Sequence, residues 1–192
     1  KYYYGDDVKT AIIVIDMLKD FVYGALKCDR ALRIIPNIKN LIKAAREKNI
    51  PIIYGNDAHL PEVDKEFDLW GPHAVKGTEG AEVIDELKPD KKDYIIGKRR
   101  YSAFFQTDLD LLLRELKVDT VILTGLHTNV CVRHTAADAF FRGYNIIIPE
   151  DCVEAFTKED HESGIRYLEK IYGAKITSSR ELIGKIRSGE IS

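Results

Sequence analysis

The sequence predicts an α/β fold, a three-layer α/β/α domain in which a mainly parallel six-stranded sheet lies between two layers of helices. Short runs rich in Ile, Val and Leu alternate with amphipathic stretches from one end of the chain to the other. The runs are continuously apolar, as in strands that are buried on both faces. Strands that alternate with helices of this length form βαβ units, whose strands are parallel. A length of 192 residues suits one core, so we expect residues 1–192 to form a single domain.

The first strand is expected at residues 11–16, where the sequence reads A-I-I-V-I-D. Each of the other expected strands is a short run that contains β-branched residues, which favour strands. These runs are residues 51–54, 94–96, 120–123, 145–148 and 174–177.

Apolar residues at helical spacing predict the helices between these strands. Residues 31–48 carry Ile35, Ile38 and Leu41 on one face, with Pro36 delaying the start of the helix. Further helices are expected at 80–87, 107–117 with Thr107 as N-cap, 130–142 with Gly143 ending it, 159–171 and 179–187. Residues 58–79 show no clear period, and a loop of that length inside a domain is usually functional.

Composition narrows the classes of function. The net charge of −2 gives no electrostatic basis for binding nucleic acid or an anionic membrane. No apolar run approaches the roughly 20 residues of a membrane span, and residues 1–5 lack the apolar core of a signal peptide. The three cysteines, Cys28, Cys131 and Cys152, show no paired spacing, which indicates a reducing compartment. We therefore expect a cytoplasmic protein that acts on a small molecule.

Three chemically complementary residues follow or end neighbouring strands. Asp16 ends the first strand, Lys98 follows the third, and Cys131 begins the helix after the fourth. In open parallel sheets, ligands bind beyond the carboxyl ends of the strands, where these residues are expected to meet. A helix N-terminus favours a thiolate and can hold an oxyanion, and a nearby carboxylate can carry the thiol proton. Taken singly, however, each residue has an ordinary non-functional explanation. Cys131 could be a core cysteine, Asp16 a turn residue and Lys98 a solvated surface lysine.

A second group of residues has the composition of a metal site. Asp57 and His59 stand two residues apart at the end of the second strand, and Glu66 and His73 lie in the aperiodic loop. Mixed histidine and carboxylate ligands suit zinc, manganese or iron. The alternative is that His73 is a loop histidine and Glu66 a solvated charge in an acidic stretch.

The other histidines, cysteines and glycines give weaker indications of a functional site. His127, His134 and His161 have no carboxylate at a telling spacing, and Cys28 and Cys152 are expected to be structural or incidental. The glycines near residues 71 and 77 lack the spacing of either nucleotide fingerprint, so no nucleotide cofactor is expected.

Several motifs match a known family. They are Val14-Ile15-Asp16-Met17 with Asp20-Phe21, Asn56-Asp57-Ala58-His59, Gly71-Pro72-His73, residues 98–104 (K-R-R-Y-S-A-F) and residues 124–132 (T-G-L-H-T-N-V-C-V). Through them the sequence resembles the isochorismatase-like cysteine hydrolase superfamily, and within it the nicotinamidases, over residues 11–179. The resemblance implies a catalytic triad of Asp16, Lys98 and Cys131. It also implies a cis Leu126–His127 bond, with the backbone N–H groups of His127 and Cys131 forming the oxyanion hole.

The resemblance further implies hydrolysis of nicotinamide to nicotinate and ammonia through a thioester. Phe21 and Trp70 would be the aromatic walls, and Asp57, His59, Glu66 and His73 would hold a divalent metal, zinc first, with manganese or iron as alternatives. A homo-oligomer, dimer or tetramer, is expected on the same basis. Two positions depart from many nicotinamidases, namely Lys65, where a histidine is common, and Val130, where some members also have histidine. The rival hypotheses are a hydrolase for N-carbamoyl or isochorismate-type substrates and, more remotely, a binding module without catalysis.

Overall fold

A computed structural model describes residues 9–192. The expectation that residues 1–5 do not form a signal peptide concerns residues outside the described part. The structure has a seven-stranded sheet in the order β3-β2-β1-β4-β5-β7, with the short β6 pairing with β4, and every pair of strands is parallel. The strands are β1 (Thr10–Ile15), β2 (Ile52–Asp57), β3 (Tyr94–Lys98), β4 (Thr120–Leu126), β5 (Asn145–Pro149), β6 (Val153–Glu154) and β7 (Lys175–Thr177). The predicted α/β class is confirmed, with one strand more than expected, because β6 is too short to show a period.

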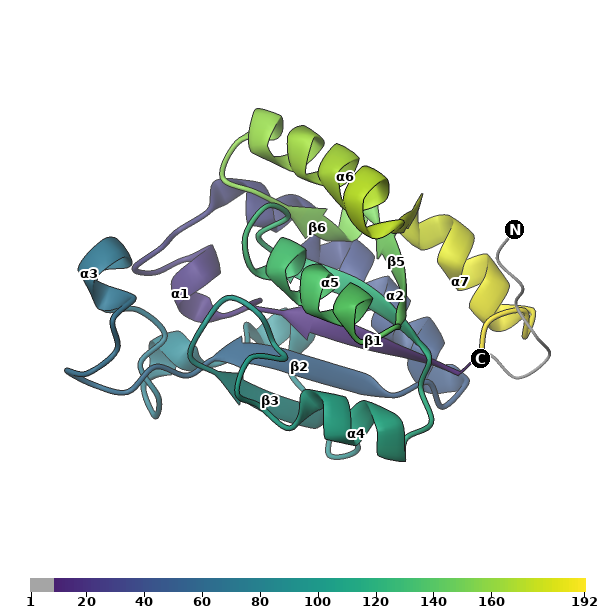
Figure 1. The fold of residues 1–192 in the computed structure, drawn as a ribbon, viewed down its shortest axis with the longest axis horizontal. Helices are drawn as coiled ribbons and strands as arrows, with labels where there is room; N and C mark the ends of the chain where they lie inside the picture. Colours follow the sequence, from purple (N-terminus) through teal and green to yellow (C-terminus); the bar gives the residue numbers. More distant parts are fainter. Residues whose placement is uncertain (1–8) are drawn as a thin grey trace.

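Helices cover both faces of this sheet (Figure 1). They are α1 (Lys19–Val22), α2 (Ile35–Glu47), α3 (Phe67–Trp70), α4 (Leu109–Glu115), α5 (Cys131–Phe141), α6 (Lys158–Tyr172) and α7 (Ser179–Arg187). Residues Asp29–Arg33, Glu79–Ala81, Asp85–Leu87 and Glu150–Cys152 form short 3-10 helices. None of the helices in the described residues has the length and apolar character needed to cross a membrane.

The predicted helix at residues 80–87 is wrong. Two 3-10 turns flank an extended segment there, in which Val83 makes a β-bridge with Leu18 and the Ile84 N–H donates to the carbonyl of Met17. Pairing with the segment after β1 therefore prevails over the helical spacing of a short stretch.

The core consists of two apolar layers, one on each face of the sheet. Along β1, Ile12 and Val14 pack in the layer that includes α2 and α7, whereas Ile13 and Ile15 pack in the layer that includes α4, α5 and α6. This alternation explains why the strand reads as a continuous apolar run, because both of its faces are buried.

Strand register brings the functional positions to one edge of the sheet. Asp57 is the Cα partner of Lys98, and Ile15, which precedes Asp16, is paired with Gly125. Gly125 has a φ of +104°, and a Cβ at this position would lie 2.0 Å from the carbonyl oxygen of Ile15. Only glycine therefore allows β4 to approach β1 this closely.

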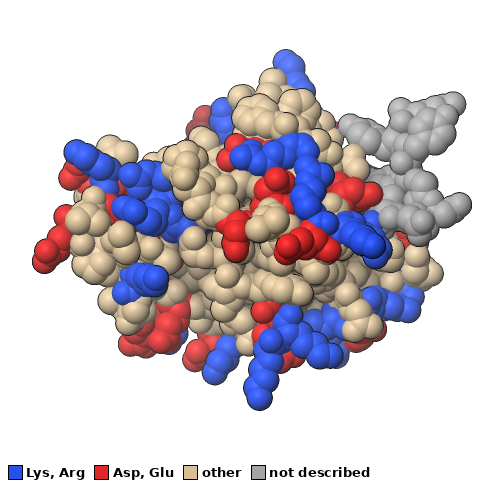
Figure 2. Space-filling view, turned by 60° about the horizontal axis from the view of Figure 1, so that its bottom comes forward, with Lys and Arg blue, Asp and Glu red and all other residues tan. Residues whose placement is uncertain are grey.

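On the surface, basic and acidic side chains lie side by side on the face that Figure 2 shows.

Candidate active site

Asp16, Lys98 and Cys131 meet in the interior at the carboxyl ends of the strands. Lys98 is the last residue of β3, Asp16 directly follows β1 and Cys131 is the first residue of α5. The Lys98 Nζ lies 2.9 Å from Asp16 Oδ2 and 3.6 Å from Cys131 Sγ. All three side chains are buried. The structure thus brings together the three residues that the sequence singled out.

Burial and charge set the resting protonation of this group. Burial opposes the Lys98 ammonium, but the carboxylates of Asp16 and Asp57 outweigh it and hold the pKa of Lys98 well above its ordinary value. Burial, together with the charge of Asp57, raises the pKa of Asp16 to about 6. Burial also raises the pKa of the Cys131 thiol well above its ordinary value, although the Lys98 ammonium opposes the rise. Cys131 therefore rests as a thiol, with a hydrogen-bonded carboxyl beside it.

The segment before α5 presents two backbone N–H groups next to the thiol. The Leu126–His127 peptide bond is cis, as the family resemblance implied. Within residues 9–192, the N–H groups of His127 and Cys131 have no backbone acceptor, whereas the His127 carbonyl accepts from Val130 and Val132. Donors at a helix N-terminus that lack partners are suited to a developing oxyanion.

The second predicted group, Asp57, His59, Glu66 and His73, forms a compact buried cluster. One ligand atom from each residue lies within 4.8 Å of the others. His59 Nε2 is 3.3 Å from both Asp57 Oδ2 and Glu66 Oε2, and His73 Nε2 is 3.6 Å from Glu66 Oε2. Burial opposes the charged form of His59, but the carboxylates of Asp57 and Glu66 raise its pKa to about 10, so the cluster attracts a cation.

The hydrogen bonds around this cluster fit a divalent metal. His59 Nδ1 lies 2.9 Å from Asp64 Oδ2, and His73 Nδ1 lies 2.8 Å from the carbonyl oxygen of Gly71. These contacts assign a proton to each Nδ1, so that each Nε2 faces the cluster and can bind a metal, which at His59 displaces the Nε2 proton. Glu66 Oε1 is buried without a hydrogen-bond partner among the described residues, and His59 Nε2 has only its ion-pair contacts with Asp57 and Glu66. Buried polar atoms are costly to leave unpaired, and a bound cation would satisfy both.

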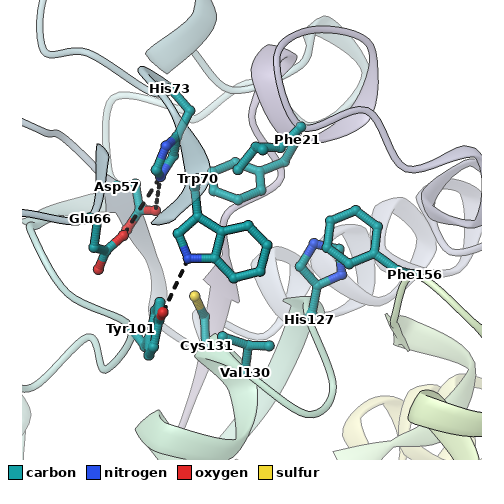
Figure 3. A pocket seen from close by; sticks show the side chains of 11 residues that line it. Phe21, Asp57, Glu66, Trp70, His73, Tyr101, His127, Val130, Cys131 and Phe156 are labelled. Carbon is teal, nitrogen blue, oxygen red and sulfur yellow. Dashed lines mark hydrogen bonds and ion pairs between the residues drawn. The ribbon is translucent and has the colours of Figure 1, made fainter. Parts of the chain in front are cut away.

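A cavity with an empty volume of about 330 Å³ joins the two groups. Cys131 lies between the metal-type cluster on one side and His127 on the other, with the Trp70 ring above it in the view (Figure 3). Phe21 is buried in the wall, and Trp70 is 38% exposed at the mouth of the cavity. Both predicted wall residues therefore line the cavity.

Comparison with known proteins identifies the family. Residues 10–181 match the family described as the Isochorismatase domain. The chain belongs to the isochorismatase family.

Solved structures of this family resemble the chain over nearly its whole length. The crystal structure of N-carbamoylsarcosine amidase from Thermoplasma acidophilum is 41% identical, with a TM-score of 0.84, covering 90% of this chain and 97% of that one. Nicotinamidase/pyrazinamidase PncA from Bacillus subtilis is 36% identical, with a TM-score of 0.85, covering 89% and 100%. Pyrazinamidase of Pyrococcus horikoshii, solved in complex with zinc, is 33% identical, with a TM-score of 0.82, covering 88% and 99%. The chain is an isochorismatase-family hydrolase, and its structural neighbours include nicotinamidases.

Several residues that line the cavity were not predicted as lining residues from the sequence. The Tyr101 hydroxyl, at the mouth, accepts a hydrogen bond from Trp70 Nε1 at 3.1 Å. Phe156, two residues after β6, stacks on the His127 ring with centroids 4.1 Å apart. Leu26 and Val130 complete the apolar lining. Tyr101 and Val130 lie within the quoted motifs, but no periodic signal marks Leu26 or Phe156.

Other sequence interpretations fared differently. Cys28 and Cys152 are buried, free and absent from the cavity lining. No sequence spacing indicated a carboxylate partner for His161, yet in the structure its Nδ1 lies 3.8 Å from Glu154 Oε1 and 2.8 Å from Thr128 Oγ1. His127 has no hydrogen-bond partner for either ring nitrogen among the described residues, but its ring lines the cavity. Sequence spacing missed these contacts because they join elements that are distant along the chain.

Proposed function

We propose that this isochorismatase-family hydrolase cleaves the carboxamide of nicotinamide, giving nicotinate and ammonia, with Cys131 as the nucleophile. The observation that supports this proposal is the position of the metal-type cluster in the same cavity as Cys131. A small aromatic amide that reaches both groups would place a ring nitrogen near the cluster and its carboxamide near the thiol.

Acylation uses Asp16, Lys98 and Cys131. Asp16 accepts the Cys131 proton as the sulfur attacks the carboxamide carbon, so that no free thiolate persists in the buried site. The Lys98 ammonium, 3.6 Å from the sulfur, stabilises the negative charge as it develops. The oxygen of the tetrahedral intermediate accepts hydrogen bonds from the N–H groups of His127 and Cys131.

Collapse of this intermediate breaks the C–N bond. Asp16 returns its proton to the leaving nitrogen, which departs as ammonia and leaves a thioester on Cys131. A water molecule then loses a proton to Asp16 and attacks the thioester carbon. The sulfur leaves, recovers its proton from Asp16 and releases the carboxylic acid product, which restores the resting site.

Asp57, His59, Glu66 and His73 would hold the divalent metal, which when bound would supply a Lewis-acid partner for the ring nitrogen. The aromatic side chains Phe21 and Trp70 would confine the flat ring between this cluster and Cys131 and exclude water from its faces. Asp57 is a member of the cluster that contacts both His59 and Lys98, so the same carboxylate fixes the relative position of the two groups.

A second candidate substrate class is an N-carbamoyl amide. The observation in its favour is the 41% identity to N-carbamoylsarcosine amidase, which exceeds the 36% identity to the nicotinamidase structure from Bacillus subtilis. Attack of Cys131 on a carbamoyl carbon would use the same proton transfers and would not need the ring nitrogen to meet the cluster.

The two candidates are separated by one assay of ammonia release. Nicotinamide and N-carbamoylsarcosine are each supplied to the purified protein, before and after chelation and after reloading with zinc, manganese or iron. Nicotinamide turnover that chelation removes and one of these metals restores would support the proposal. Turnover of N-carbamoylsarcosine alone, unaffected by chelation, would overturn the nicotinamide assignment in favour of the second candidate.

The cytoplasmic location and the homo-oligomer stay predictions. Light scattering of the purified chain would test the second, since a mass of one chain of 21.8 kDa would contradict it.

A further inference from the structure

His127 places a polar ring in the cavity that nothing in the described part of the protein satisfies. Its side chain is 3% exposed, and neither ring nitrogen has a hydrogen-bond partner within residues 9–192. Buried side-chain nitrogens normally have partners, and an unpaired one costs stability. An imidazole with two unpaired nitrogens therefore indicates a group that the free protein does not contain.

Aromatic contacts fix the orientation of this ring. Phe156 stacks on it with an interplanar angle of 24°, and the Phe21 ring lies on another side with centroids 6.2 Å apart. The ring borders the cavity on the side of Cys131 opposite His73, Glu66 and Asp57 (Figure 3). It is therefore held in place by apolar contacts, while its nitrogens remain available to a ligand.

The surroundings also restrict the kind of ligand. Burial lowers the pKa of His127 to about 4, so the ring is neutral near pH 7, with one N–H donor and one lone pair. A neutral ring would have little Coulombic attraction for a carboxylate, whereas it matches a group that also carries one donor and one acceptor.

We propose that the His127 imidazole is a specificity-determining group that hydrogen-bonds a neutral amide or carbamoyl group of the bound substrate. This proposal rests on the proposed amide hydrolysis but holds for either candidate substrate. The backbone N–H of the same residue would meet the oxygen of the tetrahedral intermediate, so one residue would contact the substrate through both its backbone and its side chain.

The test uses two substitutions that separate hydrogen bonding from packing. His127→Phe keeps an aromatic ring against Phe156 but removes both nitrogens, and His127→Asn keeps a donor and an acceptor but removes the ring. With whichever of nicotinamide or N-carbamoylsarcosine the wild type hydrolyses, we expect His127→Phe to raise KM at least tenfold. His127→Asn should raise it less. A KM for His127→Phe within twofold of wild type would overturn the proposal.

Unfolding of the protein without substrate gives a second, independent readout. Because the unpaired nitrogens cost stability, His127→Phe should raise the midpoint of urea unfolding. The matched control is His134→Phe, because the His134 Nδ1 already has the Val130 carbonyl as partner at 2.6 Å. This substitution should therefore not raise the midpoint of unfolding. A lower midpoint for His127→Phe would show that the nitrogens serve the folded structure and would contradict the proposal. If neither amide is hydrolysed by the wild type, the proposed function fails, while this readout still decides whether the ring is unsatisfied.

Discussion

Asp57 connects Lys98 to the metal-type cluster through its two carboxylate oxygens. Its Oδ1 is 2.5 Å from Lys98 Nζ, and its Oδ2 is 3.3 Å from His59 Nε2. The Asp57 N–H also donates to Asp16 Oδ1 at 2.8 Å. The register of β2 and β3, in which Asp57 is the partner of Lys98, produces this connection. Loss of the Asp57 carboxylate should therefore affect both the surroundings of the nucleophile and the metal site.

Asp57→Asn should lower the affinity for zinc at least tenfold and also lower kcat/KM at saturating zinc, because the amide replaces a charged ligand and a partner of the buried ammonium. Zinc titration and steady-state kinetics would measure the two effects. Asp68→Asn is the control, since Asp68 is an exposed acid in α3. If kcat/KM recovers fully at saturating zinc, the contact with Lys98 contributes nothing to the reaction.

Cys131→Ala should abolish ammonia release and leave the fold intact, because no other group that lines the cavity among the described residues can form the thioester. Mass spectrometry of acid-quenched wild type during turnover should detect the acyl adduct on Cys131. Cys152→Ala, which removes a buried thiol outside the cavity, is the matched control and should retain activity. The covalent mechanism is untenable if Cys131→Ala retains a tenth of the wild-type rate.

Asp64 supports His59 from outside the cluster. Its carboxylate accepts hydrogen bonds from the Leu60 N–H, from Arg99 and from His59. Burial alone would raise the pKa of Asp64, but these donors outweigh burial and hold the pKa at about 2. Asp64→Asn should lower zinc affinity by about 10- to 100-fold, as is typical when a partner of a metal-binding histidine is lost. Competition with a chromogenic chelator would measure it, with Glu62→Gln, an exposed acid in the same loop, as control. Equal affinity in both variants would show that His59 needs no such partner.

His127 should make stability depend on pH. Its pKa of about 4 in the folded protein lies below the ordinary value of 6.5, so the unfolded chain binds the extra proton between these values. The free energy of unfolding should therefore fall as pH decreases from 6.5 to 4, by up to about 3 kcal/mol from this group. The difference between wild type and His127→Phe across this range, measured by urea unfolding, isolates the contribution. Parallel curves for the two proteins would show that the ring is not buried as a neutral group.

Gly125→Ala should destabilise the protein by at least about 3 kcal/mol or prevent folding, because the new Cβ would collide with the Ile15 carbonyl at a φ of +104°. Soluble yield and thermal unfolding would measure the effect. Gly184→Ala is the control, since this glycine lies within α7 with no atom within 4 Å of the position that a Cβ would take, and the change should stabilise by about 1 kcal/mol. Comparable stability of the two variants would contradict the close approach of β4 to β1.

Sequence patterns alone determined the α/β class, the positions of six strands and the residues that stand at their carboxyl ends. They could do so because burial on both faces makes parallel strands continuously apolar, and because chain order places Asp16 and Lys98 at strand ends and Cys131 at the start of the helix after the fourth strand. Composition and spacing also pointed to the metal-type cluster, with an ordinary alternative left open, and the family resemblance added the cis bond. The roles assigned to these residues stay predictions until the assays above are made.

Only the tertiary structure decided which atoms meet. The two-sided contact of Asp57, the Asp64 support of His59 and the unsatisfied ring of His127 each depend on segments that no local period relates. The failure of the predicted helix at 80–87 has the same origin, since pairing with Leu18 is a contact between segments far apart along the chain. Local patterns report which faces are buried, whereas hydrogen-bond partners depend on strand register and loop path, which the whole chain fixes together.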